Sequence, residues 1–551
     1  MQAPPTTRAP LLRLLIPLML GISLTHWFPK DCEFFYLGIG LCTGLSGYLI
    51  LRYSQRKIAA WALLAIGGML LSCTYAWMRT PVYPRAEPLP PREVKVTLKI
   101  DRLFSRKDPY HRQGGIATIT NTPKHLQELT GQKVSFFLKE APETAAPQPG
   151  EVWAAQGVLD AFPVDAPPFG FAHTQQQEGI YFTLNRGRLL ERTQIAAPAQ
   201  RWLAQGASRL KEILAQGTPE DALGIYTAML LGDKQGMAPE TKRQFIQTGT
   251  WHLFAISGLH IGVIAFALFT ILRWLTIPAK IATCMGLSTL LLYVLIIGSS
   301  PSAMRAFLMI SFLWGAYTFK RRPAPFSALV ASALCVLMVN PLQLWNPGFQ
   351  LSYAVVSGIL LYGLPLARFL KEHYAFAPDP FLSQEAITPW QRALRWGSRS
   401  LMDAFSITLS ATLLSTPLVL GYFKLISPGA FLLNLVLIPL ASLTITMGFI
   451  SLLCGLLWMP ILSHILNTIA GGCIFALTQA TSWSAQIPYL FWEAHSRNMP
   501  ALLTGILGLT LLLILCRPHI LGNKWVRLLG PLAFVIIWTC VTLEPASIHK
   551  L

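Results

Sequence analysis

The chain has 551 residues, of which 53% are hydrophobic and only 13% are charged, and its formal net charge is +19. Apolar runs of about 18 or more residues recur along it, and a helix of that length crosses about 30 Å of hydrocarbon. These features exclude an ordinary water-soluble protein and predict a polytopic α-helical membrane protein. The positive charge leaves two interpretations open, nucleic acid as a partner or positive cytoplasmic loops.

Three apolar runs, at about residues 11–28, 34–51 and 58–78, open the chain. A positive loop, "RYSQRK" at 52–57, separates the second run from the third. Because positive loops stay on the cytoplasmic side, this loop and the N-terminus are predicted to be cytosolic. Residues 1–78 are therefore predicted to form three N-terminal transmembrane helices, the last of which leads to the outside.

The following interval, residues 79–189, changes to a two-residue period and is predicted to be an extracytoplasmic domain. In "EVKVTLKI", from Glu93 to Ile100, valine, leucine and isoleucine alternate with lysine and threonine, which is typical of a half-buried strand. Four further short runs of this kind follow, separated by Gly and Pro loops. Five such strands predict a small β-barrel of the OB type. A five-stranded sandwich of another topology fits the pattern nearly as well.

Basic and aromatic residues gather in the first part of this domain. Basic grooves that carry aromatic side chains bind single-stranded nucleic acid through phosphate contacts and base stacking. Taken alone, such a stretch is more often a solvated loop than a binding site. The candidate nucleic-acid-binding residues are Lys95, Lys99, Arg102, Phe104, Arg106, Lys107 and Arg112.

Residues 190–249 are predicted to form amphipathic or linking helices. Between Ala196 and Gly217, large apolar residues recur at helical spacing, with arginine and lysine between them. Such a helix either lies along the outer membrane surface or packs its apolar stripe against the barrel or the membrane bundle. The sequence leaves both interpretations open.

Residues 250–551 are predicted to form a transmembrane channel domain of about ten spans, which makes about 13 in the whole chain. Several of these spans open with polar residues next to glycine or proline, as in "TGTWHLFAISGLHIG" at 248–262. Inside lipid, such breaks are tolerated only where protein or a water-filled cavity surrounds them. They are predicted to line one passage through Asp233, His252, Ser257, Gly258, His260, Arg305, Asn346, Gln350 and Asn434.

Two alternatives to this passage stay open. The polar residues can simply hydrogen bond between neighbouring helices. Ser257 with His252 or His260 can also act as an intramembrane serine hydrolase or protease. The sequence contains neither a HExxH motif nor a Gly-Lys dipeptide, which excludes a zinc protease of that type and a P-loop nucleotide hydrolase. We expect no enzymatic activity, no cofactor and no metal site in this chain.

The stretches "AMLLGDKQGM" (228–237), "FIQTGTWHLFAISGLHIG" (245–262), "GSSPSAMRA" (298–306), "NPGFQLSYA" (346–354) and 415–441 resemble the competence domain of the ComEC-type DNA uptake channels. The segment from Phe169 to Leu184 also resembles the one that closes the OB domain of that family, although its usual Asn-Pro-Gly-Gly-Phe start is missing. The resemblance implies an inner- or plasma-membrane channel that admits single-stranded DNA to the cytoplasm during natural transformation.

The resemblance also implies partners, with single-stranded DNA as cargo and membrane lipid as the surroundings. An extracytoplasmic DNA receptor would deliver the DNA, and a cytosolic ATP-dependent translocase would supply energy. Many family members carry a metallo-β-lactamase-like domain with an H-x-H-x-D-H metal site, but no H-x-H occurs among the 11 histidines here. Strand degradation is therefore expected to belong to a separate nuclease, whether this chain is a natural short form or a truncated one. Assembly into a homo-oligomer is left open.

Overall fold

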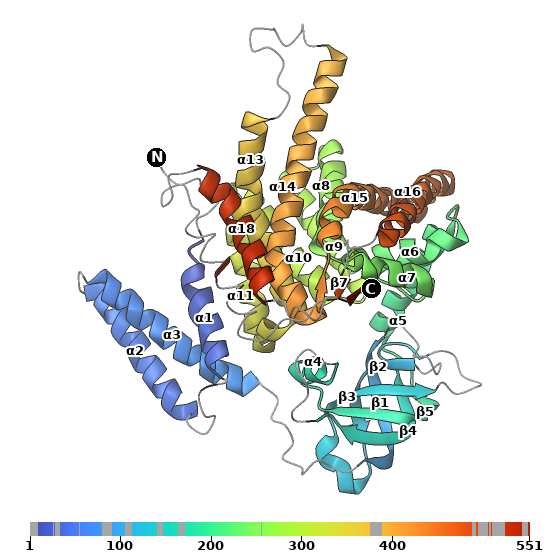
Figure 1. Ribbon diagram of the computed structural model, residues 1–551. Helices are drawn as coiled ribbons and strands as arrows, with labels where there is room; N and C mark the ends of the chain where they lie inside the picture. Colours follow the sequence, from blue (N-terminus) through green and yellow to red (C-terminus); the bar gives the residue numbers. More distant parts are fainter. Residues whose placement is uncertain are drawn as a thin grey trace.

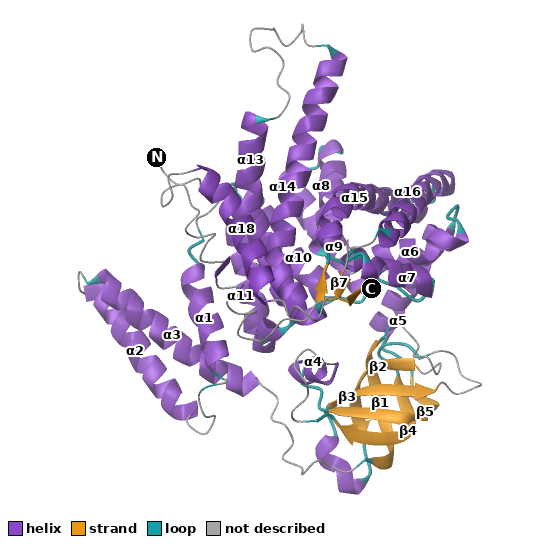
Figure 2. Cartoon of the chain, in the orientation of Figure 1, coloured by secondary structure: helices purple, strands orange, loops and turns teal. Residues whose placement is uncertain are grey.

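The computed structural model describes residues 9–25, 27, 33–53, 56–79, 91–104, 113–139, 147–163, 171–254, 256–374, 388–487, 492–493, 505, 508–509, 524–542 and 549–550. Three parts follow one another along the chain (Figure 1). A small group of helices comes first, a compact β-barrel second, and a large helical bundle third. Figure 2 shows that most strands lie in the barrel and that the rest of the protein is almost entirely helical.

The N-terminal part consists of α1 (Leu12–Leu24), α2 (Glu33–Tyr53) and α3 (Lys57–Arg79), the three helices that the sequence predicts. Glycines allow α2 and α3 to approach closely, because a Cβ at Gly67 would lie only 2.7 Å from the backbone nitrogen of Gly44. α1 packs against α3 and against α11 (Pro325–Val339) of the bundle. Many large apolar side chains of α2 are exposed, as expected for a helix that faces lipid.

The barrel is formed by β1 (Arg92–Leu103), β2 (Gln113–Asn121), β3 (Lys133–Lys139), β4 (Val152–Ala161) and β5 (Phe182–Gln194). It closes in the order β1-β2-β3-β5-β4. β3 and β5 are parallel, and the other neighbours are antiparallel. The prediction of a small five-stranded barrel is confirmed, in preference to the open sandwich.

The alternating pattern of the strands explains the core of the barrel. Val94, Val96 and Leu98 point inward from β1, whereas Lys95 and Lys99 point outward and are exposed. The fifth strand continues beyond the predicted boundary at residue 189, because residues up to 194 pair with β4. A short helix, α4 (Phe171–Gln177), and the 3-10 helix η3 (Lys124–Leu129) complete this part.

Three helices follow the barrel in the chain: α5 (Pro198–Ala215), α6 (Glu220–Leu231) and α7 (Pro239–Gln247). The C-terminal half of α5 packs against α6 and α15 (Pro428–Leu456), so the packing interpretation holds for that half. α6 is buried along most of its length within the main core of the bundle. It is therefore part of the bundle rather than a linker, because its apolar residues cover every side of the helix.

In the rest of the bundle, a π-helical turn, η6 (Ile359–Gly363), joins α12 (Pro347–Gly358) to α13 (Leu364–His373). Short elements, η4 (Trp251–Phe254), η5 (Pro341–Trp345) and the small strands β6 (Leu425–Ile426), β7 (Trp492–Glu493) and β8 (His549–Lys550), lie between or after them. The remaining helices are α8 (Gly258–Trp274), α9 (Ala279–Ile296), α10 (Pro301–Thr318), α12 (Pro347–Gly358), α13 (Leu364–His373), α14 (Pro389–Phe423), α16 (Pro460–Gln486) and α18 (Lys524–Thr542).

Within the described residues, seven helices are long and apolar enough to cross a membrane, and four further apolar helices are shorter. The chain is therefore a multi-pass membrane protein, as its composition predicts. The seven include the continuous stretch Pro347–His373. The larger total of 13 spans that the sequence predicts stays a prediction, since it includes helices shorter than a full crossing and residues outside the described ranges.

Candidate polar site at four helix starts

Three helices of the bundle, α8, α10 and α12, begin close to one another, and α15 begins beside the segment between α7 and η4. The Ser302 hydroxyl of α10 donates to the carbonyl oxygen of Ile256, just before α8. Arg305 of α10 donates to the carbonyl oxygen of Gly348 at the start of α12. A Cβ at Gly249 would lie 2.7 Å from the hydroxyl of Ser427, which precedes α15. Helix starts carry unpaired N–H groups and a partial positive charge, so their convergence favours an anion.

Ser257 and His260 form a capping box at the start of α8. The Ser257 hydroxyl accepts a hydrogen bond from the Leu259 nitrogen at 3.2 Å and lies 2.9 Å from His260 Nδ1. Nδ1 also accepts from the Ser257 nitrogen, which assigns the ring proton to Nε2. His260 is 2% exposed, and Nε2 has no hydrogen-bond partner among the described residues. The nearest backbone group that faces the ring is that of Leu253, which does not meet the geometric criteria for a hydrogen bond to Nε2.

The capping geometry makes Ser257 a structural residue in our interpretation, since a serine hydrolase needs a histidine that a third group orients. We expect Ser257→Ala to lower the free energy of unfolding by about 1 kcal/mol, the usual cost of losing such a cap. Labelling of the protein by a serine-reactive fluorophosphonate is expected to be absent in both forms. Labelling of the wild type that the substitution removes would instead support the hydrolase.

Arg305 is the most unusual residue of the site. Its side chain is 3% exposed, and Nη2 donates to the Gly348 carbonyl oxygen at 2.9 Å. Nε and Nη1 are buried and have no hydrogen-bond partner in the part of the chain that the structure describes. A buried charge that lacks a counter-ion is costly in protein and in lipid. The arrangement is therefore suited to water or to an anionic ligand beside Arg305.

The other predicted lining residues near these helix starts divide into two kinds. The Oδ1 atom of Asn434 on α15 is buried without a partner among described residues. By contrast, Asn346 Oδ1 caps α12 by accepting from the Gly348 nitrogen at 2.8 Å. Gln350 donates to the Leu344 carbonyl oxygen at 3.0 Å and accepts from the Tyr422 hydroxyl at 2.8 Å. Asn346 and Gln350 thus hold the helices in place, and Asn434 differs from them because its Oδ1 atom has no partner in the described part of the chain.

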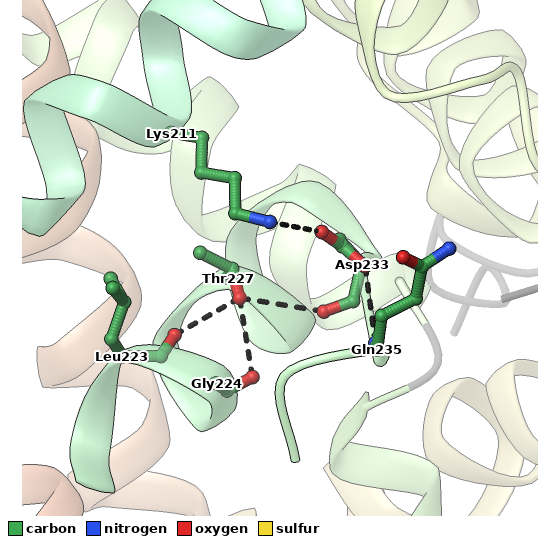
Figure 3. Close-up of polar contacts among 6 residues, drawn as sticks. All are labelled: Lys211, Leu223, Gly224, Thr227, Asp233 and Gln235. Atoms are coloured by element: carbon green, nitrogen blue, oxygen red, sulfur yellow. Dashed lines mark hydrogen bonds and ion pairs between the residues drawn. The ribbon is translucent and has the colours of Figure 1, made fainter. Parts of the chain in front are cut away.

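Asp233 belongs to a separate polar contact, at the turn after α6 (Figure 3). Its carboxylate accepts from Lys211 of α5 at 2.8 Å and from the Gln235 nitrogen at 3.1 Å. The Thr227 hydroxyl lies 3.4 Å from its carbonyl oxygen. Asp233 therefore holds the turn against α5.

His252 lies in η4, where Nδ1 is 3.3 Å from the Gly249 carbonyl oxygen.

The predicted nucleic-acid residues of the barrel are placed in different surroundings. Lys95, Lys99 and Arg102 are exposed on β1, and Arg102 lies 3.6 Å from Glu178 in an ion pair. Phe104 is half-buried against Phe137 and Phe171, so it contributes to an aromatic cluster. The other three candidates, Arg106, Lys107 and Arg112, lie outside the described residues.

Two features were missed by the sequence reasoning. Lys234 and Lys242 both lie over the ring of Trp251, with Nζ at 4.8 and 5.2 Å from its centroid. Asn467 is fully buried in α16 and makes hydrogen bonds to residues of α5 and α6 and to the segment between them. Neither feature has a signal in the sequence spacing, because each depends on elements that meet only in the folded bundle.

The fold and the site together define a multi-span membrane protein with a small barrel and a polar, positively charged site among helix starts. The sequence was also compared with models of known protein families. The competence protein family matches residues 229–519, which is more than half of the chain. The chain therefore belongs to the competence protein family, and the resemblance seen in its sequence is confirmed.

Individual relatives are similar over parts of their length. ComE operon protein 3 of Bacillus subtilis is 36% identical over 143 residues, covering 26% of this chain and 18% of that protein. Recombination protein 2 of Haemophilus influenzae is 26% identical over 357 residues, covering 63% of this chain and 41% of that protein. Competence protein ComA of Neisseria gonorrhoeae is 26% identical over 176 residues, covering 29% of this chain and 24% of that protein. The chain thus spans less than half the length of these relatives. No solved structure matches it.

Proposed function

We propose that this protein is an inner- or plasma-membrane channel through which single-stranded DNA enters the cytoplasm during natural transformation. The observation that carries the proposal is the buried guanidinium of Arg305, two of whose nitrogen atoms have no hydrogen-bond partner among the described residues, beside converging helix starts. An intramembrane charge of this kind marks an ion or substrate pathway by default. A DNA backbone, with one phosphate charge per nucleotide, is the anion that membership of a competence family favours.

The helix starts supply further stabilisation along the path. Backbone N–H groups at a helix N-terminus bind phosphate oxygens, and the helix dipole favours negative charge there. His260 Nε2 adds a side-chain donor, and both His260 and Arg305 are buried enough to be shielded from bulk water. A phosphate that leaves water would thus exchange its hydration for fixed donors, which lowers the cost of crossing the bilayer.

We propose about 13 spans, with the N-terminus in the cytosol and the barrel outside. This orientation places the starts of α8, α10, α12 and α15 on the same side as the barrel. The exposed residues Arg273, Lys280 and Lys320 then lie on the cytoplasmic side, as the positive-inside rule requires. Figure 1 supports this, since the tips of α13 and α14 and the barrel lie at opposite ends of the molecule.

We further propose that the barrel is an OB-fold that receives the strand. Its strand order, with parallel pairing of β3 and β5, supports this assignment. Neither Phe136 nor Trp153 is available for base stacking, because both are core residues of the barrel. The exposed residues Lys95 and Lys99 of β1 would therefore contact phosphates rather than bases.

The barrel is expected to bind single-stranded DNA when residues 91–196 are expressed alone. For single strands, log K should fall with log salt by about 0.7 for each neutralised phosphate, so Lys95→Gln with Lys99→Gln should reduce the slope by about 1.4. Lys124→Gln on η3 removes one charge elsewhere on the barrel and is the control. An absence of binding at low salt would leave β1 as an ordinary solvated surface.

We propose no catalytic activity for the chain itself. The energy would come from a cytosolic ATP-dependent translocase, the second strand would be degraded by a separate nuclease, and an extracytoplasmic receptor would supply the DNA. Labelled duplex DNA, delivered to cells with and without this protein, tests the proposal. Loss of nuclease-resistant single strands from the cytosol, with binding at the cell surface retained, is the expected result. Unchanged cytosolic label would overturn the proposal.

A further inference from the structure

α5 carries an apolar stripe that the bundle covers only in part. Its members recur every three or four residues and therefore share one side of the helix: Trp202, Gly206, Leu210 and Ile213. Leu210 and Ile213 are buried, and a Cβ at Gly206 would lie 3.5 Å from the side chain of Ile296. Trp202, on the same side, is 56% exposed. The described part of the protein therefore leaves more than half of this aromatic side chain uncovered.

The uncovered side chain lies near the end of a membrane span. Ile296 is the last residue of α9, which is long and apolar enough to cross a bilayer. The final turn of α9 also exposes Leu292 and Leu295, as expected for a surface that faces acyl chains. Trp202 precedes Gly206 by one helical turn, which is about 6 Å along the axis of α5. Tryptophan is enriched at this depth, where acyl chains give way to headgroups.

Another side of α5 is polar and exposed. Its residues also recur at helical spacing: Arg201, Gln205, Ser208 and Glu212. Arg209 lies nearer to the apolar stripe, but its guanidinium is 3.0 Å from Glu212 in an ion pair. A helix with an apolar and a charged side binds at a membrane interface with its apolar side toward the acyl chains. Beside Trp202, the long side chain of Arg201 can extend to headgroup phosphates.

The start of α5 lies directly beside the barrel (Figure 1). Only residues 195–197 separate it from β5. The side chain of Gln200 fills the space beside Gly150, where a Cβ would overlap it. The next residue, Glu151, is buried and accepts from Trp153 Nε1 at 2.9 Å and from Arg192 at 3.0 Å. A contact between the start of α5 and lipid would therefore also set the position of the barrel.

We propose that the first turns of α5 anchor the barrel to the membrane surface, with Trp202 inserted where the headgroups meet the acyl chains. The partner is phospholipid in the leaflet on the barrel's side. Ile296 lies shortly before Pro301, where α10 begins, so the anchor holds the barrel on the side of the polar site. The inference concerns lipid and goes beyond DNA uptake, so either one can fail without the other.

The test uses the full chain in phosphatidylcholine nanodiscs. A fluorescent amino acid whose emission depends on polarity replaces Trp202 or, as the matched control, Gln205 on the exposed polar side. Emission at 202 should lie at shorter wavelength than emission at 205. A lipid with a nitroxide near its headgroup should cause a larger loss of emission at 202 than at 205, and a larger loss than a nitroxide at the end of the acyl chain. Equal quenching at both positions, or none at 202, would overturn the anchor.

Two other occupants of this surface would give different results. A shift to shorter wavelength at 202 that nitroxide lipids leave unquenched would assign Trp202 to a contact with a second copy of the chain and overturn the anchor. A change in emission at 202 that occurs only when a thymidine oligonucleotide is added would assign it to base stacking and overturn the lipid contact.

A second measurement applies if the fluorescent variants fail to fold. The wild-type protein is irradiated in nanodiscs that contain a phosphatidylcholine with a diazirine near its headgroup. Lipid adducts are expected on the first turns of α5, and Trp202→Ser should reduce their amount. Absence of adducts on these turns would again overturn the anchor.

Discussion

Replacement of Arg305 by leucine is expected to reduce uptake of DNA into the cytosol by about 100-fold, because losing one side of a buried charge interaction costs about 3 kcal/mol or more. The protein should stay folded in the membrane. A leucine fills much of the same volume, and the cost of burying an unpaired guanidinium disappears with the charge. The amount of membrane protein and its thermal unfolding temperature should therefore be unchanged or higher.

Arg273→Leu is the matched control for this prediction. Arg273 is exposed near the end of α8, away from the helix starts, so its loss removes the same charge without touching the proposed path. The two variants are compared for uptake of labelled DNA and for unfolding in detergent. Normal uptake in Arg305→Leu would make Arg305 a packing residue. A large loss of stability would assign it a purely structural role through Gly348.

Replacement of Asn467 by leucine is expected to have the largest effect on stability. Asn467 accepts from the Tyr226 hydroxyl at 3.1 Å and donates to the carbonyl oxygens of Ile213 and Gln216, both at 2.8 Å. Leucine is similar in size but leaves all three groups buried or half-buried without these bonds, at about 1 kcal/mol or more for each. We expect a loss of about 3 kcal/mol and a fall of several degrees in the unfolding temperature.

Thr478→Val is the control in the same helix. Thr478 is half-buried, and its one hydrogen bond to a described residue stays within its own turn, to the Phe475 carbonyl oxygen. Thermal unfolding of the purified protein in detergent checks the comparison, and uptake per folded molecule should be little changed in both variants. Equal unfolding temperatures for the two variants would mean that the segment between α5 and α6 is held to α16 by packing alone.

The sequence predicts two kinds of feature well: alternating apolar and polar residues, and polar residues that interrupt an apolar run. Alternation in "EVKVTLKI" predicts a strand whose lysines point outward, and β1 has that arrangement. Arg305 and His260 were found because polar residues at the start of an apolar run are conspicuous. The predicted domain boundary at residue 189 cuts off the end of β5, which reaches Gln194, because the second half of that strand faces solvent and lacks strong alternation.

Other features depend on tertiary contacts that no local pattern records. Gln350 and Asn434 are both polar residues in apolar segments, so the sequence predicts the same role for them. In the structure, Gln350 makes two side-chain hydrogen bonds, whereas Asn434 has a buried atom without a partner among the described residues. An aromatic side chain can stack on a base or pack against other side chains, and the sequence does not distinguish the two. Phe104 packs against Phe137. Lys234, Lys242 and Trp251 come from three segments of the chain, so only the folded bundle brings them together.

The most direct test of the central claim is whether DNA in transit touches the polar site. A photo-crosslinking amino acid is placed at position 434 or, as a control, at Phe266, which is 73% exposed on α8. Uptake is stalled by a streptavidin bound to the trailing end of the labelled strand, and the sample is irradiated. The account predicts crosslinks to DNA at position 434 and none at 266, and only while the strand is stalled. Equal crosslinking at both positions, or a stalled strand without crosslinks at 434, would contradict a passage through the helix starts.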